Sequence, residues 1–190
     1  ELNDPQRFNT MSWDLGDDVR LAVNHLSGCA CVRALTLQGA GSTFCAGGTP
    51  HSSRLGHTSL ALVARSLYDS LQGFVGVRSM PMAIVCAVHG TMVGGAAAIF
   101  LQTDVRVADH RSTFQHGNLP RGVCPVAGYS RLLQVAIGVA QAHTFHLTDR
   151  RITAAEACAL GLVHQVFSTV ETTKQRSQHL AAALALPHEA

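Results

Sequence analysis

The sequence predicts an α/β fold in which helices alternate with the strands of a largely parallel sheet. Short apolar runs, such as residues 84–88, alternate along the chain with segments of helical periodicity. Glycine-containing turns follow two of the predicted strands, at residues 46–48 and 94–95. The 190 residues are 47% hydrophobic, which is enough for one core, and no internal repeat or low-complexity linker divides them. We therefore expect a single domain.

Residues 1–48 predict a turn, a helix and a strand in that order. Residues 2–5 end a strand and turn, and Ser12 is the expected N-cap of a helix that ends near Gly28. Apolar residues recur at helical spacing in this segment: Met11, Leu15, Val19, Val23 and Leu26. Residues 32–37 predict a strand, and residues 39–42 predict the turn that leads to Ala46-Gly47-Gly48.

The central segment carries the second glycine turn. A helix is expected over residues 60–74, and residues 84–88 predict a buried strand. Gly94-Gly95 follows this strand and precedes a helix over residues 96–101. The first N–H groups of a helix have no intrahelical partner and lie at its positive end. Such a turn suits an anion, or a carbonyl oxygen that is about to become one.

The C-terminal part predicts further strands and helices. A strand is expected at 105–108, a loop at 114–125, and amphipathic helices at 128–136 and 138–147. Thr153 and Glu156 form a capping box for a helix that ends at Gly161. A strand over 162–166 and a helix over 170–186 complete the alternation.

Composition excludes several classes of function. The net charge of +2 without a basic run gives no support for nucleic-acid binding, and no apolar stretch approaches the roughly 20 residues of a membrane helix. No signal peptide opens the chain, and six scattered cysteines indicate reduced thiols in an intracellular, cytoplasmic protein. His25, Cys29 and Cys31 lack a second ligand pair, so no metal site is expected. Only 14% of residues are charged, which favours a surface buried against other subunits or domains.

Several motifs in order resemble the crotonase superfamily, which includes the enoyl-CoA hydratases and isomerases. The resemblance covers nearly the whole chain and rests on the opening turn, both glycine turns, residues 125–131 and the C-terminal run Asp149-Arg150-Arg151-Ile152-Thr153-Ala154-Ala155-Glu156-Ala157 with Gly161-Leu162-Val163. It implies a spiral of ββα units, assembled as trimers or paired trimers. Family members generally continue beyond the position of Ala190 into trimerisation helices, so we expect residues 1–190 to be one crotonase-like domain that is truncated or excised from a larger protein.

The resemblance also implies a substrate and a site. The family binds acyl thioesters of coenzyme A or of carrier-protein phosphopantetheine and needs no other cofactor. Two backbone N–H groups polarise the thioester carbonyl, and by position these belong to Gly48 and Gly95. Ala46, Gly47 and Gly94 complete the two turns that line the substrate.

This chain departs from the family at both catalytic glutamates. The glutamate on the helix after the second turn corresponds to Ala98, and the glutamate of the following loop corresponds to Asn118. Neither side chain can act as a general acid or base. Asn118 remains a candidate site residue that donates a hydrogen bond to the substrate, with a plain turn residue as the alternative, and Ala98 is expected to line the substrate. His116 is the candidate replacement, because a histidine titrates near pH 6.5, although a surface-loop or core-bonded histidine without a catalytic role is equally open. His51 and Arg54 follow the first turn and are candidates for binding a substrate carboxylate or the phosphates of the cofactor portion.

The sequence leaves three functions open. Family members without the two glutamates include decarboxylases of polyketide β-branching cassettes, in which the enolate forms when CO₂ departs and no base is needed. The alternatives are a hydratase or isomerase that uses His116 as its acid and base, and a non-catalytic acyl-binding or scaffold subunit. We favour the decarboxylase-like reaction.

Overall fold

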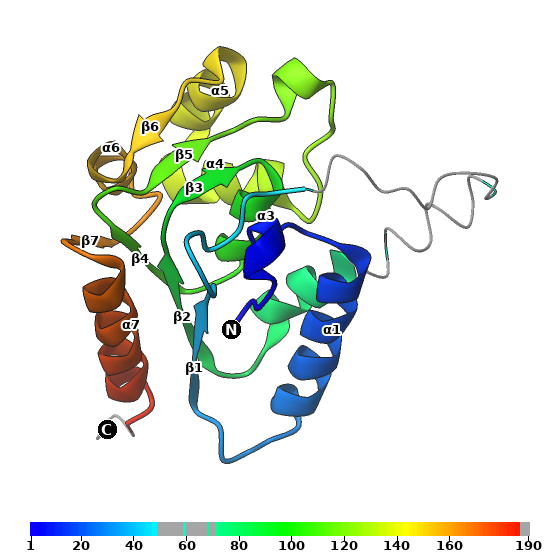
Figure 1. The fold of residues 1–190 in the computed structure, drawn as a ribbon, viewed down its shortest axis with the longest axis vertical. Helices are drawn as coiled ribbons and strands as arrows, with labels where there is room; N and C mark the ends of the chain where they lie inside the picture. The colour runs from blue at the N-terminus through cyan, green and yellow to red at the C-terminus, as the bar shows by residue number, and fades with distance from the viewer. Residues whose placement is uncertain (49–58, 60–67, 69–70, 187–190) are drawn as a thin grey trace.

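The computed structural model of the chain describes residues 1–48, 59, 68 and 71–186 (Figure 1). Within them the strands form two sheets, and the predicted order of strands and helices is interrupted by the short strands β3, β5 and β6, which the sequence does not predict. The strands are β1 (Ala34–Gln38), β2 (Ala83–Val88), β3 (Thr91–Val93), β4 (Val105–Asp109), β5 (Thr113–Gln115), β6 (Ile152–Thr153) and β7 (Gln165–Phe167). The helices are η1 (Pro5–Arg7), α1 (Trp13–Ser27), η3 (Val77–Ser79), α3 (Gly95–Phe100), η4 (Leu119–Arg121), α4 (Tyr129–Ile137), α5 (Val139–Thr148), α6 (Ala154–Ala159) and α7 (Val170–Leu184).

The larger sheet has four strands in the order β1-β2-β4-β7, and every pair in it is parallel. Its central strand β2 is fully buried from Val85 to Val88, which explains why this stretch of sequence is a continuous apolar run rather than an alternating one. The smaller sheet has the order β3-β5-β6, with β3 parallel and β6 antiparallel to β5. The predicted α/β class is confirmed.

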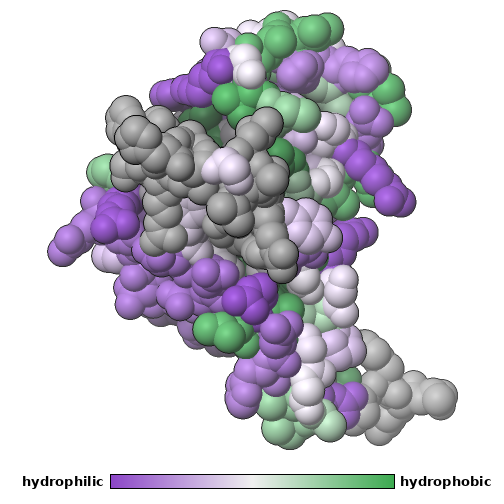
Figure 2. Space-filling view, turned by 90° about the vertical axis from the view of Figure 1, so that its right-hand side faces the viewer, coloured by the Kyte–Doolittle hydropathy of each residue, from purple (hydrophilic) through white to green (hydrophobic). Residues whose placement is uncertain are grey.

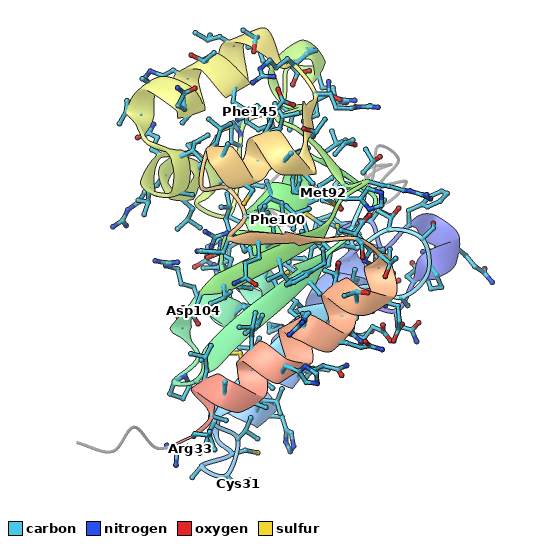
Figure 3. All side chains as sticks on the ribbon, turned by 90° about the vertical axis from the view of Figure 1, so that its left-hand side faces the viewer. Cys31, Arg33, Met92, Phe100, Asp104 and Phe145 are labelled. Carbon is cyan, nitrogen blue, oxygen red and sulfur yellow. The ribbon has the colours of Figure 1, made fainter. Side chains whose placement is uncertain are left out.

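Helices cover the larger sheet on opposite sides (Figure 1). Helix α7 packs against all four of its strands, and Figure 3 shows α7 crossing in front of the sheet. Helix α1 lies on the other side, where residues 71–76 form the end of the helix predicted over 60–74; the rest of that prediction falls outside the described residues. Helix α1 and the helix at residues 71–76 approach closely at Gly73, where an added Cβ would collide with the backbone of Gly16.

Local signals predict the helix ends well. The Ser12 side chain accepts a hydrogen bond from the N–H of Leu15 and thereby begins α1. Thr153 and Glu156 form the predicted capping box at the start of α6, in which each side chain accepts a hydrogen bond from the other residue's N–H. Both features depend only on neighbouring residues, which is why the sequence reveals them.

Two predicted boundaries are wrong. The expected loop over 114–125 begins with β5, whose pairing with β3 depends on a segment more than twenty residues away. The strand expected over 162–166 lies at 165–167, because the N–H groups of Leu162 and Val163 donate to the carbonyl of Ala157 and close the end of α6. Gly161, with φ of 82°, makes that closure possible.

The cysteines are only partly in the core. Cys45 and Cys86 are buried, and burial raises the pKa of the Cys45 thiol to about 12, so it stays protonated. Cys31 and Cys124 are exposed. All six thiols are free.

Hydrophobic side chains are exposed on the outer face of α4 and α5. Val135, Val139 and Leu147 are 71%, 57% and 67% exposed. Figure 2 shows hydrophobic surface at the upper end of the molecule, the end at which Figure 1 places α5. This surface agrees with the low charge content of the sequence.

Candidate functional site

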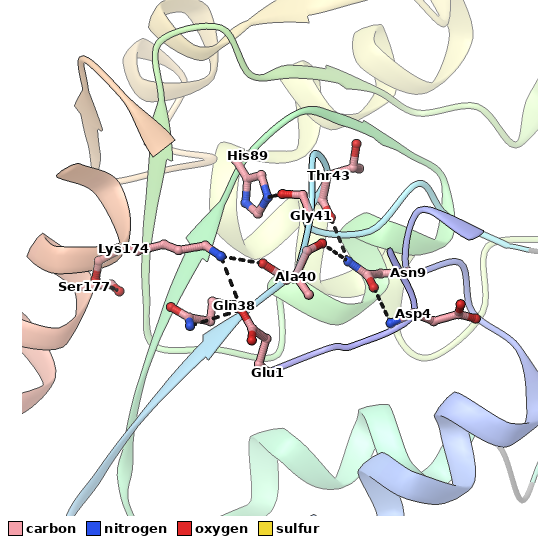
Figure 4. Close-up of polar contacts among 11 residues, drawn as sticks. Glu1, Asp4, Asn9, Gln38, Ala40, Gly41, Thr43, His89, Lys174 and Ser177 are labelled. Carbon is pink, nitrogen blue, oxygen red and sulfur yellow. Dashed lines mark hydrogen bonds and ion pairs between the residues drawn. The ribbon is translucent and has the colours of Figure 1, made fainter. Parts of the chain in front are cut away.

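The first glycine turn is held in place by the buried side chain of Asn9 (Figure 4). Its amide group donates to the carbonyls of Ala40 (2.9 Å) and Thr43 (2.8 Å), and its Oδ1 accepts from the N–H of Asp4 at 2.7 Å. The N–H of Ala46 donates to the carbonyl of Phe8 at 3.0 Å. The opening segment of the chain and the first turn are therefore one hydrogen-bonded unit.

His89 fastens the same unit to the end of β2 (Figure 4). Its Nε2 lies 3.0 Å from the carbonyl oxygen of Gly41, and because a carbonyl can only accept, Nε2 carries the proton. Burial lowers the pKa of His89 below its usual value, so the ring is neutral at pH 7. The backbone adds a second link, since the N–H of Phe44 donates to the His89 carbonyl.

The two glycine turns lie against each other. A Cβ on Gly47 would collide with the carbonyl oxygen of Val93, and a Cβ on Gly95 would stand 3.3 Å from the amide nitrogen of Gly48. A Cβ lies about 2.5 Å from its own amide nitrogen, so the nitrogens of Gly48 and Gly95 are less than about 6 Å apart. Two nitrogens that each donate to one shared acceptor at about 2.9 Å must also lie less than about 6 Å apart, so the spacing of Gly48 and Gly95 is compatible with a shared acceptor.

Some backbone N–H groups of these turns have a hydrogen-bond acceptor within the protein, and others do not. The N–H of Gly47 contacts Cys45 Sγ at 3.4 Å, and the N–H of Gly94 donates to the carbonyl of Gln115 at 3.2 Å. Among the described residues no acceptor is recorded for the N–H of Gly48 or Gly95. Gly94, with φ of 55° and ψ of −111°, turns the chain into α3 without a side-chain cap. The unused donors are the two that the resemblance singles out.

Ala98 and Asn118 both lie near the second turn. Ala98 is fully buried in α3, three residues after Gly95. Asn118 Oδ1 lies 3.4 Å from the point at which a Cβ on Gly94 would stand. That oxygen is buried and has no hydrogen-bond partner in the described part of the chain. Asn118 therefore presents an unsatisfied polar group beside the turn, whereas Ala98 offers only a methyl group.

His116 lies close to Asn118 in sequence, but its ring packs toward α4 and α5. The ring stacks on Tyr129, with centroids 4.7 Å apart, and meets the edge of Phe145 at 6.0 Å. Its Nδ1 lies 3.3 Å from Nδ1 of His146. Burial, with the neighbouring His146, lowers the pKa of His116 to about 4, well below the value near 6.5 that the sequence suggests. The ring is therefore neutral at pH 7.

Asp149 holds the backbone that carries His116 and Asn118. One carboxylate oxygen accepts from the Gln115 side chain at 2.9 Å, and the other accepts from the N–H of Gly117. The sequence marks Asp149 only as part of a family motif, because its partners are about 30 residues away in the chain. Met11, whose sulfur contacts Gly95, is likewise visible only in the structure.

Two predicted substrate-binding residues, His51 and Arg54, lie outside the described residues. Across residues 1–48 and 71–186, no group of three or more His, Cys, Asp or Glu side chains could hold a metal ion. None of the helices in the described part of the chain is long and apolar enough to cross a membrane. The predicted roles of Gly48, Gly95, His116 and Asn118 stay predictions, although the structure brings the first two and Asn118 together.

Comparison with known proteins identifies the family of the chain. Residues 1–188 match the family model described as enoyl-CoA hydratase/isomerase. The probable enoyl-CoA hydratase EchA12 of Mycobacterium tuberculosis is 32% identical over 170 residues, which are 85% of this chain and 59% of that protein. A probable enoyl-CoA hydratase of Rhodobacter capsulatus is 28% identical over 183 residues, which are 95% of this chain and 70% of that protein.

Solved structures show the same similarity. A probable enoyl-CoA hydratase/isomerase from Mycobacterium abscessus superposes with a TM-score of 0.84 at 30% identity, covering 97% of this chain and 70% of that one. The enoyl-CoA hydratase from Bacillus anthracis superposes with a TM-score of 0.85 at 25% identity, covering 95% and 69% of the two chains. The chain therefore belongs to the enoyl-CoA hydratase/isomerase family of the crotonase superfamily.

Proposed function

We propose that the protein acts on an acyl thioester of coenzyme A or of a carrier protein and stabilises a thioester enolate between the N–H groups of Gly48 and Gly95. The observation that carries the proposal is the pairing of two adjoining backbone donors, for which no acceptor is recorded among the described residues. A thioester enolate carries its negative charge on the former carbonyl oxygen. Donors aimed at that oxygen stabilise the transition state, and each contributes on the order of 3 kcal/mol.

The reaction is decarboxylation of a β-carboxyl acyl thioester. The bond between the α-carbon and the carboxylate breaks, CO₂ leaves, and the electron pair delocalises onto the thioester oxygen. The enolate then takes a proton from water at the α-carbon. Breaking this bond needs no general base, which suits a site with Ala98 and Asn118 in place of carboxylates. The Oδ1 of Asn118 has no partner in the described part of the chain and can accept a hydrogen bond beside the second turn, so it suits an N–H or O–H group of the substrate rather than the carboxylate.

Hydration or isomerisation through His116 is the alternative, and the environment of His116 argues against it. A base whose pKa is near 4 is weak, and a neutral ring is a poor acid at pH 7. Its Nδ1 is also engaged with His146. These contacts support a structural role, in which the ring fills the space between Tyr129 and Phe145.

The partners in this proposal are the thioester carrier and further protein surface. Coenzyme A or phosphopantetheine enters as part of the substrate, and no metal or other cofactor is needed for the chemistry. The exposed side chains of Val135, Val139 and Leu147 support assembly as a homotrimer or within a larger multidomain protein.

The test is a mass-spectrometric screen of the protein against malonyl, methylmalonyl and crotonyl thioesters of coenzyme A and of pantetheine. Loss of 44 mass units from a β-carboxyl substrate supports decarboxylation. Gain of 18 mass units on the crotonyl substrate would instead identify a hydratase. Saturable binding without turnover of any member of the panel would identify an acyl-binding subunit and overturn the proposed reaction.

A further inference from the structure

Met11 connects the two glycine turns, a position that its sequence context does not reveal. Its N–H donates to the carbonyl of Gly47 at 2.8 Å, and Met11 forms a parallel bridge with Gly48. The residues on either side are fixed as well, since Asn9 is tied to Ala40 and Thr43 and Ser12 caps α1. The backbone of Met11 therefore moves with the first turn.

The side chain of Met11 reaches the second turn. Its sulfur occupies the space beside the Gly95 α-carbon, so a Cβ added at position 95 would collide with it. The same point in space is 3.3 Å from the amide nitrogen of Gly48. The thioether thus lies next to both of the donors proposed to bind the thioester oxygen. A glycine at 95 is what leaves room for it.

We infer that Met11 determines which α-substituents the site accepts, by forming the wall beside the bound thioester carbonyl. The inference rests on the proposed function, because it places the thioester oxygen between the N–H groups of Gly48 and Gly95. The α-carbon of the acyl group is only two bonds from that oxygen, so a group attached to it comes within contact distance of the side chain that covers Gly95. That side chain is Met11, which is partly buried and packs against the main core.

The chemistry of methionine suits such a wall. Its unbranched side chain has three rotatable bonds and a polarisable sulfur, so it can fit closely around a small acyl group. A β-branched residue at the same place would be stiffer. The size of the space that Met11 leaves therefore sets a limit on α-branching, and shortening the side chain removes that limit.

The experiment measures dissociation constants rather than turnover, using S-acetyl- and S-isobutyryl-pantetheine with the full chain. Pantetheine is common to coenzyme A and carrier proteins, and the two acyl groups differ only in branching at the α-carbon. Met11→Ala should raise the ratio of isobutyryl to acetyl affinity about 10-fold or more, since one methylene in a pocket is typically worth roughly 10–200-fold. Met11→Leu, which keeps the volume, should leave the ratio within about threefold.

Controls separate this inference from the proposed function and from simple destabilisation. Val19→Ala shortens another partly buried residue that packs against the hydrophobic core, from within α1 rather than from the segment that bridges to Gly48, and should leave the ratio unchanged. If the unaltered protein binds both ligands and Met11→Ala changes both affinities equally, the inference is wrong while the proposed function stands. If the unaltered protein binds neither acyl-pantetheine, the proposed function fails and this inference fails with it.

Discussion

Gly95 offers a test of the proposed oxyanion donor, because one substitution at this position removes the N–H group and another keeps it. Gly95 is the first residue of α3, a position at which proline fits the helical backbone. Gly95→Pro removes the N–H, whereas Gly95→Ala retains it. Both variants add a Cβ that collides with the sulfur of Met11, and proline alone also places its Cδ on the nitrogen in place of the hydrogen.

The magnitude follows from these contacts. Displacing the end of a flexible methionine side chain belongs at the lower end of the overpacking range, about 1 kcal/mol of unfolding free energy for either variant. Removing one donor from an oxyanion site costs on the order of 3 kcal/mol in the transition state. Gly95→Pro should therefore turn over the thioester substrate about 10²-fold more slowly than Gly95→Ala.

The assay is single-turnover decarboxylation of a malonyl thioester, followed as CO₂ release, with urea unfolding of each variant as the stability control. The same pair should also be made in the Met11→Ala background, in which the shared collision is relieved. Gly28→Ala is a control for glycine replacement, because Gly28 has φ of −84° and a Cβ there meets only the His25 carbonyl at 3.6 Å. Equal rates for folded Gly95→Pro and Gly95→Ala proteins would refute the assignment of Gly95 as a donor.

Three further predictions address the acid and base positions, His116 and the surface. Hydration of crotonyl-CoA should be very slow in the unaltered protein. The double variant Ala98→Glu with Asn118→Glu should hydrate crotonyl-CoA faster than either single variant, since each positioned acid or base typically contributes about 10²–10⁴-fold. Coupled spectrophotometric assays measure the hydration rate, and fast hydration by the unaltered protein would contradict the prediction. Below pH 6.5 the unfolded protein binds a proton at His116, whereas the folded protein binds it only near pH 4. The free energy of unfolding should therefore fall by up to about 3 kcal/mol as the pH is lowered over that range. Denaturant titrations at pH 4–7 should show a weaker dependence for His116→Phe, with decarboxylation at pH 7 changed little; a rate loss of 10²-fold would instead identify His116 as the proton carrier. Replacing exposed Val139 and Leu147 by Gln should reduce self-association measured by light scattering, whereas a monodisperse monomer before substitution would show that this face is not an assembly surface.

Much of the fold follows from local chemistry. The strand at 84–88 is readable because every side chain of a central parallel strand is buried, and the start of α6 is readable because Thr153 and Glu156 satisfy each other's N–H groups. The short strands are harder to predict. β5 and β6 are three and two residues long and exist only because of partners elsewhere in the chain. Nothing within such short segments separates a strand from a loop.

The sequence by itself determines the α/β class, both glycine turns and the absence of glutamate at positions 98 and 118. It does so because these properties belong to single residues or to neighbours in the chain. The tertiary structure alone decides that the turns adjoin, that the sulfur of Met11 lies across Gly95, and that the ring of His116 is enclosed by Tyr129, Phe145 and His146. Each of these depends on contacts between segments far apart in sequence. The lowered pKa of His116 has the same origin, because burial disfavours the charged ring and no pattern of adjacent residues encodes that burial.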